Sequence, residues 1–398
     1  MASIVQRGKS YSVVYYSEEN GIRKQKWESF RSEKDALHRK CMVEYCQQAK
    51  KGLAHRPQTV EQLLQEYVWL YGRAKWSLSM YTSSWGLIQN YINPYFGSVR
   101  LEELTPRLVS KLYMEFQKEP RYCGTYHKYE GQSVSASILK SVHKLLHSAF
   151  EQAVRWEYVD RNPFHKAVLP KTKAAQSVFL SPEQIQLLLH HCSVSWLRLA
   201  IELSFVCTLR RGELLALTWD DINWGQNSLQ ISKTLCRVSK NAMLMLDERD
   251  VLRIFPTDTR SRTVLVLKSP KTESSNRIIY FPPSLKRSLL EWQDVQKKSA
   301  IGELPRLIFA YEDNRPLQGG VLTKHFQKLL EQCNLPKVTF HSLRHSSITY
   351  KLVLTGGDIK AVQGDSGHSQ ADMITEIYGH ILDANRRKNT EKFEEEFY

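Results

Sequence analysis

Six side chains in the second half of the chain have the residue types needed to transfer a phosphodiester to a protein hydroxyl group. Such a transfer needs a nucleophilic oxygen, a proton donor for the leaving oxygen, and cations to balance the extra negative charge on the phosphate oxygens. A tyrosine supplies the nucleophile, lysine and histidine move protons, and two arginines bind the phosphate bidentately. In chain order the six are Arg210, Lys271, His341, Arg344, His368 and Tyr378.

Each of these residues has an ordinary structural explanation when it is taken alone. Arg210 and Glu213 lie three residues apart, so on a helix they would share a face and form an ion pair. Lys271, between two predicted strands, would be a solvated turn lysine, and Tyr378 would be a core residue near a helix end. Only the combination meets the needs of one reaction, in which Lys271 protonates the leaving oxygen and His341 assists the loss of the tyrosine proton.

Neither a metal nor a nucleotide cofactor is expected. His341 and His345 have the i, i+4 spacing of metal ligands on a helix, and His341 and Arg344 project from the same side of one turn. However, no Glu lies inside the histidine pair, as it does in the zinc motif H-E-x-x-H, so a zinc site is disfavoured. The sequence also contains no G-x-x-x-x-G-K-[ST] loop and no acidic cluster of the two-metal type.

The elements that position these residues begin with a small N-terminal unit, predicted over residues 1–57. Residues Ser10–Tyr16 are β-branched and aromatic, Asn20-Gly21 favours a hairpin turn, and Ile22–Phe30 has the composition of a returning strand. A capped helix is then predicted over residues 32–50. The unit has twelve Lys/Arg against six Asp/Glu, so its sheet either binds DNA or presents a solvated basic face.

A helical unit is predicted over residues 58–165. Apolar residues with helical spacing begin at Val60 and Leu63, and a later helix of the same pattern runs from Val134 to Ala153. A bundle of about four helices accounts for this pattern. A lysine-containing linker over residues 166–177 follows it.

The last unit, residues 178–398, is predicted to mix helices with strands. Ser181 has the features of a helix N-cap, with Pro182 in the first turn, and the chain is again helical from Leu317. The expected fold class is therefore α+β and multidomain, with a small sheet-plus-helix domain, an all-α domain and a mixed α/β domain. Strands of the last unit are predicted over Leu229–Val238, Arg262–Leu267 and Arg277–Phe281, with the third returning after the Lys271 hairpin.

The composition is that of a folded intracellular protein with a polyanionic partner. The chain of 398 residues carries 56 Lys+Arg against 41 Asp+Glu, a formal charge of +15, and 42% of its residues are hydrophobic. This apolar content is too high for a disordered chain, and the charge favours nucleic acid as a partner. The seven cysteines are scattered without a C-x-x-C pair, which is typical of reduced thiols in a cytosol. No apolar stretch is long enough for a signal peptide or a membrane span.

In this order and spacing, the reactive residues resemble the catalytic domain of the tyrosine recombinases, the phage integrase family. The series is R-x-x-E at 210–213, a hairpin lysine, H-x-x-R at 341–344, Gly367-His368 and Tyr378. The resemblance covers about residues 59–398, and the first fifty residues are similar to the small arm-binding domain of integrases from conjugative transposons. Further similar stretches are Trp156–Pro163, at the end of the family's core-binding domain, Leu214–Ile222, after the first arginine, and Arg277–Pro282, after the lysine hairpin.

The resemblance implies a role for each residue of the set. Arg210 and Arg344 would hold the scissile phosphate, Lys271 would protonate the leaving oxygen, and His341 would assist proton transfer. His368 would hydrogen-bond the phosphate, and Tyr378 would be the nucleophile that forms a 3′-phosphotyrosyl link to DNA.

Three positions depart from the family pattern without removing a reactive group. Thr208 stands where the family often has Gly, so the local turn is expected to differ, and Ser342 and Ser366 stand where Asp and Leu are usual. Glu213 matches the family's acidic position and would support the geometry of the site. Arg211 does not keep the R-x-x-E spacing and is therefore not assigned to the site.

The implied function is site-specific DNA recombination by an integrase that cuts and rejoins DNA, without ATP or a metal, to integrate and excise a mobile genetic element. Its partner would be double-stranded DNA at core and arm sites, on which four protomers assemble, with accessory excision or DNA-bending proteins as further partners. A DNA-binding regulator and a topoisomerase IB-like strand transferase are the alternatives. The expected location is the bacterial cytoplasm, on the nucleoid. The stretch Val238–Arg262 is interpreted as an insertion with its own hairpin, for which a DNA contact and a protein–protein contact are both open.

Overall fold

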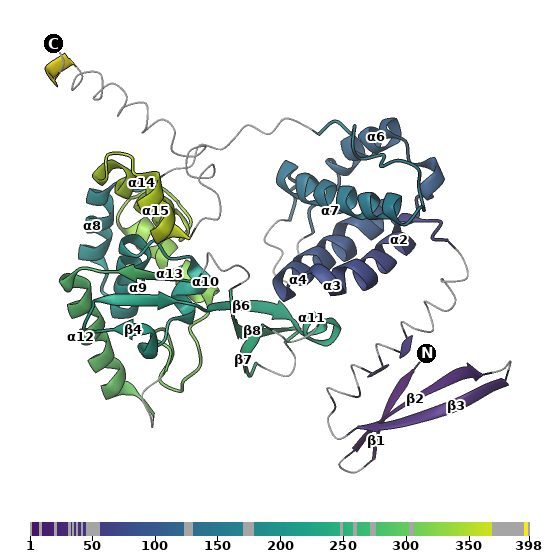
Figure 1. The fold of residues 1–398 in the computed structure, drawn as a ribbon, viewed down its shortest axis with the longest axis horizontal. Helices are drawn as coiled ribbons and strands as arrows, with labels where there is room; N and C mark the ends of the chain where they lie inside the picture. Colours follow the sequence, from purple (N-terminus) through teal and green to yellow (C-terminus); the bar gives the residue numbers. More distant parts are fainter. Residues whose placement is uncertain are drawn as a thin grey trace. The chain divides into compact units, whose positions relative to one another are not determined.

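The computed structural model places residues 1–174 and 238–248 in one unit and residues 175–237 and 249–398 in a second (Figure 1). Within the described residues, no helix is long and apolar enough to cross a membrane. The finer division at residues 57 and 165 stays a prediction. The described residues are 2–7, 10–19, 22–30, 56–122, 130–169, 179–246, 250–257, 261–270, 276–301, 306–367 and 394–396, with six helical residues between Glu33 and Glu44.

A three-stranded antiparallel sheet begins the first unit. Its strands β1 (Ser3–Arg7), β2 (Ser10–Glu19) and β3 (Ile22–Phe30) lie in that order. Val13 and Tyr15 of β2 lie two residues apart, on one face, and pack with residues of the helical segment that follows the sheet. β2 and β3 confirm the two predicted strands, whereas β1 was not predicted because five residues with two large apolar side chains give little alternation to detect.

Capped helices make up the all-α part of the first unit, and they confirm the predicted helical pattern. The N-cap hydroxyls of Thr59, Ser77, Thr105 and Ser135 each accept a backbone N–H from the residue three positions later. The first helix, α2 (Val60–Tyr67), continues through a π-helical turn (Val68–Gly72) into α3 (Arg73–Lys75). In the same way, α4 (Leu78–Leu87) continues through a second π-helical turn (Ile88–Ile92) into α5 (Asn93–Phe96). The helices α6 (Pro106–Phe116) and α7 (Ala136–Arg155) follow.

The start of the predicted insertion belongs to the first unit. It contains α11 (Lys240–Met245), which Ser239 caps and which packs against α4. The backbone N–H of Ser239 donates to Thr82 Oγ1 (3.0 Å), and Asn241 Nδ2 donates to the hydroxyl of Tyr81 (3.4 Å). The start of the insertion therefore packs on its own chain, and a DNA contact or a protein–protein contact stays a prediction.

The strands after residue 220 form two sheets. One has the order β4 (Ile222–Asn223), β5 (Ser228–Ile231), β9 (Arg277–Tyr280), and the other has the order β6 (Thr234–Ser239), β8 (Thr263–Lys268), β7 (Val251–Phe255). β7 pairs antiparallel with β8, which begins after Arg262, so the hairpin predicted inside the stretch Val238–Arg262 is wrong in its bounds: only one of its two strands lies there.

Two details of the strand prediction are wrong. The continuous strand expected over Leu229–Val238 is divided between β5 and β6, which lie in different sheets. The break occurs at Lys233, whose Nζ lies 2.8 Å from Asp221 Oδ1 and donates to Thr218 Oγ1 (3.0 Å). In addition, β9 pairs with β5, so among the described strands it is not the hairpin partner of β8.

Helices of the second unit support the predicted site. The capping box of Ser181 and Gln184 is confirmed at the start of α8. Buried side chains of α8, α9, α13 and strands β5 and β9 share one apolar cluster, and each large side chain of this kind contributes about 1.5–3 kcal/mol on burial. The helices are α8 (Pro182–His191), α9 (Ser195–Val206), α10 (Arg211–Ala216), α12 (Pro283–Ser299), α13 (Gly319–Gln332), α14 (Ser342–Leu354) and α15 (Ile359–Ser366).

Candidate active site

The structure gathers part of the predicted residue set around the N-termini of α10 and α14 and the C-terminus of α15. Arg210 and Glu213 lie at the start of α10, and His341 and Arg344 lie at the start of α14. The predicted residues Lys271, His368 and Tyr378 lie outside the described residues, so their roles stay predictions.

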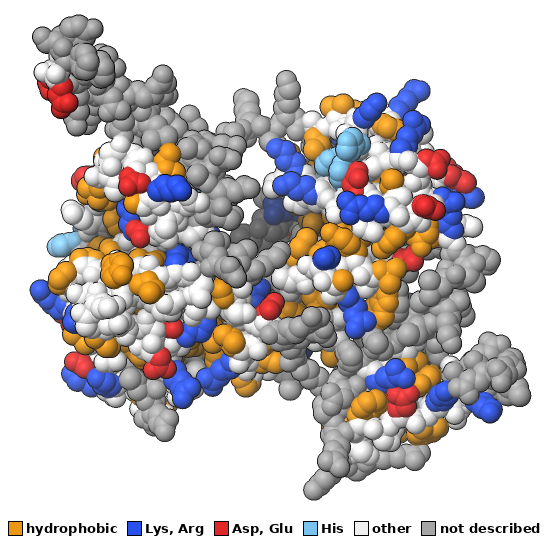
Figure 2. Space-filling view, viewed as in Figure 1, with side chains coloured by type: hydrophobic (Ala, Val, Ile, Leu, Met, Phe, Trp, Pro, Cys, Tyr) orange, Lys and Arg blue, Asp and Glu red, His pale blue; other side chains and the backbone are white. Residues whose placement is uncertain are grey.

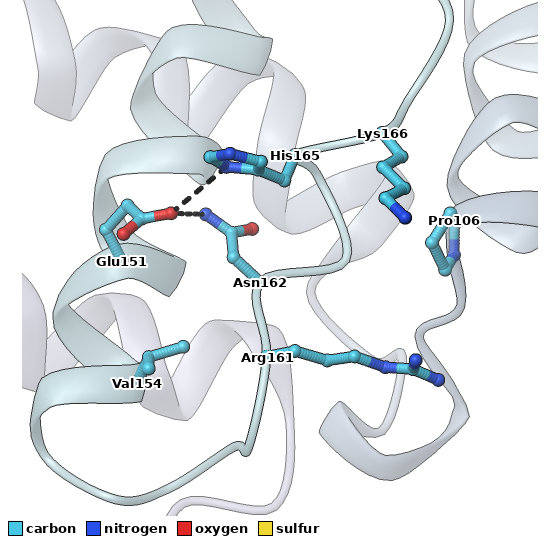
Figure 3. A pocket seen from close by; sticks show the side chains of 7 residues that line it. All are labelled: Pro106, Glu151, Val154, Arg161, Asn162, His165 and Lys166. Carbon is cyan, nitrogen blue, oxygen red and sulfur yellow. Dashed lines mark hydrogen bonds and ion pairs between the residues drawn. The ribbon is translucent and has the colours of Figure 1, made fainter.

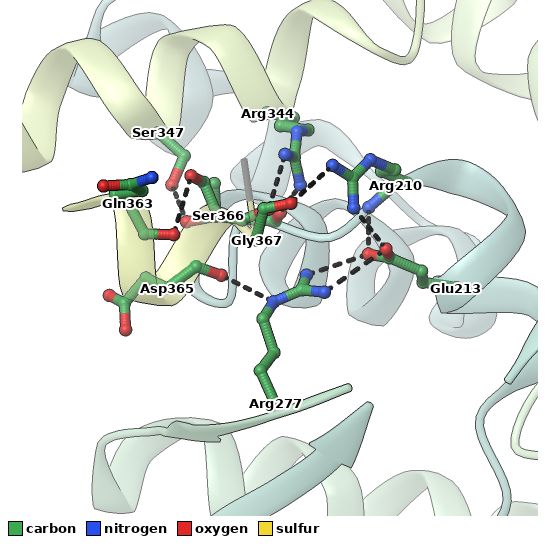
Figure 4. A network of polar contacts seen from close by, with 10 residues as sticks. Arg210, Glu213, Arg277, Arg344, Ser347, Gln363, Asp365, Ser366 and Gly367 are labelled. Carbon is green, nitrogen blue, oxygen red and sulfur yellow. Dashed lines mark hydrogen bonds and ion pairs between the residues drawn. The ribbon is translucent and has the colours of Figure 1, made fainter. Parts of the chain in front are cut away.

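Glu213 fixes Arg210 through two hydrogen bonds (Figure 4). Its Oε2 accepts the backbone N–H of Arg210 (2.9 Å), and its Oε1 accepts from Arg210 Nη1 (2.7 Å). The prediction that the two residues share a helix face is wrong, because Arg210 precedes α10 in an extended conformation, with ψ at 146°. Glu213 instead reaches back from the first turn of the helix, as in a capping box, and the bond to Nη1 fixes the guanidinium group as well.

Arg277 is a third arginine of the cluster, and sequence reasoning missed its role. Its Nη2 donates to Glu213 Oε2 (2.9 Å), and its Nε donates to the carbonyl oxygen of Asp365 (2.8 Å). The residue is buried at the start of β9, where buried and exposed residues alternate. The one available signal was an arginine at an inward-facing strand position, because a buried cation needs a partner.

Burial and charge have opposite effects on Glu213. Burial alone would raise the pKa of its carboxyl group, but the hydrogen bonds and charges of Arg277 and Arg210 outweigh burial and lower the pKa below its ordinary value. Glu213 is therefore an anion at neutral pH, and it balances one of the two cations that contact it.

Arg344 is almost completely buried, with 1% of its surface exposed. Its Nη1 donates to the carbonyl oxygen of Thr208 (2.6 Å), and its Nη2 donates to that of Ser366 (2.6 Å). Arg210 Nη2 donates in the same way to the carbonyl oxygen of Gly367 (2.9 Å). The last carbonyl groups of a helix lack partners within the helix and carry the negative end of its dipole, so the two arginines stabilise the C-terminus of α15.

Thr208 has a backbone conformation that glycine favours. Its φ is +54°, it is fully buried, and its hydroxyl lies 2.8 Å from Ser347 Oγ. A left-handed conformation costs an ordinary L-residue about 1–2 kcal/mol. Thr in place of Gly predicts a different turn here, but the hydrogen bond between the Thr208 and Ser347 hydroxyls and the bond from Arg344 to the Thr208 carbonyl hold the left-handed turn in place.

We expect Thr208→Gly to be more stable than Thr208→Ala by about 1 kcal/mol, because both variants lose the hydroxyl and only glycine relieves the left-handed strain. Urea unfolding of the full chain, followed by circular dichroism, measures the difference between the two variants. Equal stabilities would show that the conformation at this position carries no strain.

His341 is neutral at pH 7 in the DNA-free protein. Partial burial of the ring, and then the nearby charges of His345, Arg344, Arg210 and Arg211, lower its pKa to about 4. Its ring lies edge-on to that of His345, with centroids 4.8 Å apart. A neutral imidazole beside guanidinium groups can accept a proton from a hydroxyl group that approaches a bound anion.

The described cluster is suited to bind an anion. Arg210, Arg277 and Arg344 supply three positive charges and Glu213 one negative charge, which leaves 3 − 1 = +2. Arg277 and Arg344 are buried, whereas the Arg210 side chain is 36% exposed. Arg211, the neighbour that was not assigned to the site, instead donates from Nη1 to Thr323 Oγ1 (3.3 Å), away from Glu213. Arg210 is therefore the member of the cluster most open to an approaching phosphate.

Comparison with known proteins agrees with this geometry. The model of the phage integrase family matches residues 178–385, just over half of the chain. A tyrosine recombinase XerC-like protein of Caldanaerobacter subterraneus is 26% identical over 286 residues, which cover 68% of this chain and 69% of that protein.

Two solved structures share the fold. The Tn1549 transposon integrase in complex with a circular intermediate DNA has a TM-score of 0.66 at 20% identity, over 85% of this chain and all of that chain. The lambda integrase tetramer bound to a Holliday junction has a TM-score of 0.54 at 16% identity, over 92% of this chain and 96% of that chain. These likenesses confirm the predicted fold class. The chain belongs to the phage integrase family and is a tyrosine recombinase, an enzyme of site-specific DNA recombination.

Proposed function

We propose that this recombinase is the integrase of a mobile genetic element and that it cuts DNA through Tyr378. The observation that carries the proposal is the bonding of Arg344 and Arg210 to the carbonyl groups of Ser366 and Gly367. These two residues immediately precede His368, and Tyr378 follows ten residues after His368. The fold therefore anchors the start of the segment that carries the proposed nucleophile on the arginines proposed to hold the phosphate.

The proposed first step breaks one phosphodiester bond and forms another. The Tyr378 oxygen attacks the scissile phosphorus and loses its proton with assistance from His341, which is neutral at pH 7. The bond from phosphorus to the 5′-oxygen breaks, and Lys271 protonates that oxygen. Arg210, Arg344 and His368 stabilise the charge on the non-bridging oxygens. Attack by a 5′-hydroxyl from another strand reverses these events and needs no ATP, because the phosphotyrosyl bond keeps the energy of the bond that was cut.

The burial of Arg344 adds a condition to this mechanism. As the DNA-free chain stands, its two Nη atoms contact carbonyl oxygens and only 1% of the residue is exposed. A phosphate that contacts Arg344 must therefore reach a guanidinium group that the DNA-free chain covers.

The proposed partner is double-stranded DNA, on which four protomers assemble in the bacterial cytoplasm. Support comes from the net charge of +15, from Lys and Arg side chains spread over the visible faces of both units (Figure 2), and from the DNA-bound states of the two solved relatives. The N-terminal sheet would bind arm sites while the helical and catalytic parts hold the core site, and accessory excision or bending proteins would act with them.

The test is recombination by the full chain of a plasmid that carries both ends of the encoding element, without added nucleotide. We expect the full chain to form excision circles. Removal of residues 1–57 should leave cleavage of a core site intact. The same removal should strongly impair recombination between full sites, because the second DNA contact is lost. Southern blotting or junction PCR measures the circles. If removal of residues 1–57 also abolishes core cleavage, the sheet is not an independent arm-binding domain. If the full chain forms no circles even when a host-cell extract supplies the accessory proteins, the proposed reaction is wrong.

A further inference from the structure

A cluster of two histidines and one carboxylate lies on the helical part of the first unit. His147 and Glu151 stand one turn apart on α7, and His165 comes from the segment that follows this helix. His147 Nε2 lies 3.2 Å from His165 Nδ1, and Glu151 Oε1 lies 3.5 Å from His165 Nδ1 and 3.9 Å from His147 Nε2. The three side chains are 33%, 41% and 69% exposed in chain order, so solvent reaches the cluster.

These distances match three corners of a tetrahedral metal site. Zinc binds imidazole nitrogen and carboxylate oxygen at about 2.0–2.2 Å, which puts neighbouring ligand atoms about 3.3–3.5 Å apart. The distances from His165 Nδ1 to His147 Nε2 (3.2 Å) and to Glu151 Oε1 (3.5 Å) lie within about 0.2 Å of that range. The distance between Glu151 Oε1 and His147 Nε2 (3.9 Å) would have to shorten by about half an ångström. The ring centroids of His147 and His165 are 5.3 Å apart, and two imidazoles on one tetrahedral zinc ion would have centroids about 5.2 Å apart.

Asn162 positions the carboxylate of this cluster (Figure 3). Its Nδ2 donates to Glu151 Oε1 (2.7 Å) and to the carbonyl oxygen of His147 (3.0 Å), and its Oδ1 accepts the N–H of Phe164 (2.9 Å). One amide side chain therefore ties the segment that carries His165 to the turn of α7 that carries the other two residues. Such hydrogen bonds to ligand groups orient a metal site before the ion arrives.

We propose that His147, Glu151 and His165 bind one Zn²⁺ ion, which joins α7 to the segment that follows it. Two imidazoles and one carboxylate form a ligand set that suits Zn²⁺. His143, one turn earlier on α7, is not included, because the group whose ligand atoms lie within 4.8 Å of one another consists of His147, Glu151 and His165. The site is structural and takes no part in the phosphodiester chemistry.

A fourth ligand has room beside the three residues. Glu151 and His165 also line a cavity of about 320 Å³, together with Asn162, Arg161 and Lys166. Its lining includes the cationic side chains of Arg161 and Lys166, which favour a water molecule or a small anion over a neutral or cationic side chain as the fourth ligand.

The competing explanation of the same geometry is a hydrogen bond between the two imidazole rings, with His165 paired to Glu151 and no metal. The two explanations differ in zinc affinity. A hydrogen-bonded pair gains nothing from Zn²⁺, whereas a preformed ligand set binds it and is stabilised by it in proportion to occupancy.

The test is equilibrium dialysis of the full chain against micromolar free Zn²⁺, with bound zinc measured by mass spectrometry. We expect His147→Ala and His165→Ala each to lose one equivalent relative to wild type. We expect His190→Ala, which removes an exposed histidine at the end of α8, to bind as much as wild type. Asn162→Ala is expected to weaken binding about tenfold or more through loss of positioning.

A second readout separates binding from misfolding. Zn²⁺ should raise the melting temperature of wild type and of His190→Ala but not that of His165→Ala, and the most exposed ligand, His165, can be removed without damage to the core. Cobalt substituted for zinc should give the visible absorption of a tetrahedral site in wild type and in His190→Ala, but not in His147→Ala or His165→Ala. Equal zinc binding by wild type, His147→Ala and His165→Ala would overturn the proposal, as would the absence of zinc binding by wild type.

Discussion

Replacement of Arg344 by alanine is expected to lower the free energy of unfolding of the second unit by about 3–5 kcal/mol and to slow DNA cleavage by about a thousandfold or more. The loss of stability follows because the carbonyl groups of Thr208 and Ser366, both fully buried, lose their guanidinium donors. The loss of rate follows because one of the two proposed phosphate ligands is removed. Urea unfolding and the single-turnover rate of covalent complex formation measure the two effects.

Two further variants make this result specific. Arg344→Lys keeps the charge but cannot reach two carbonyl groups in a fixed fork, so we expect partial recovery of stability and little recovery of cleavage. Arg211→Ala is the matched control, since Arg211 is exposed and bonded to Thr323 on α13, and its stability should stay within about 0.5 kcal/mol of wild type. Cleavage by Arg344→Ala at the wild-type rate would contradict the proposed phosphate contact.

Glu213→Gln is expected to cost about 3 kcal/mol of stability at pH 7, because it removes the carboxylate that pairs with both Arg277 and Arg210. It should also slow cleavage, since Arg210 loses the group that fixes its guanidinium. Urea unfolding at several pH values gives the stability, and the covalent-complex rate gives the effect on cleavage.

The pH dependence of this variant provides a further check with a definite sign. The pKa of Glu213 is lowered in the folded chain, so its contribution to stability is complete above the unfolded value of about 4.3 and is lost as the pH falls through the folded value. Wild type should therefore lose more stability than Glu213→Gln on acidification below about pH 4.3. Parallel losses in the two proteins would show that the Glu213 carboxylate is not held by the arginines.

Local patterns predicted those parts of the fold whose cause is itself local. The Ser181 capping box, the helix from Val60 and the hairpin strands β2 and β3 depend on residues a few positions apart, and all of them are confirmed. The spacing of Arg210 and Glu213 likewise indicated their pairing. The spacing did not show that Arg210 precedes the helix, because a capping interaction and an ion pair on one helix face have the same sequence separation.

The parts that sequence reasoning missed depend on long-range contacts. Arg277 joins the site because β9 pairs with β5, which brings it to a carboxylate 64 residues earlier. The break at Lys233 comes from a salt bridge to Asp221, outside the strand itself. The same holds for α11, whose place beside α4 depends on residues about 160 positions apart. The periodicity of a single sequence does not indicate which residues far apart in the chain contact one another.

The most direct test of the account uses a nicked suicide duplex that carries the core site of the encoding element. We predict that wild type forms a protein–DNA complex that survives detergent and boiling, and that Tyr378→Phe binds the duplex but forms no such complex. Tyr350→Phe, at an exposed tyrosine of α14, is the control and should form the complex as wild type does. A covalent complex in Tyr378→Phe, or none in wild type in spite of clear DNA binding, would contradict the assignment of Tyr378 as the nucleophile.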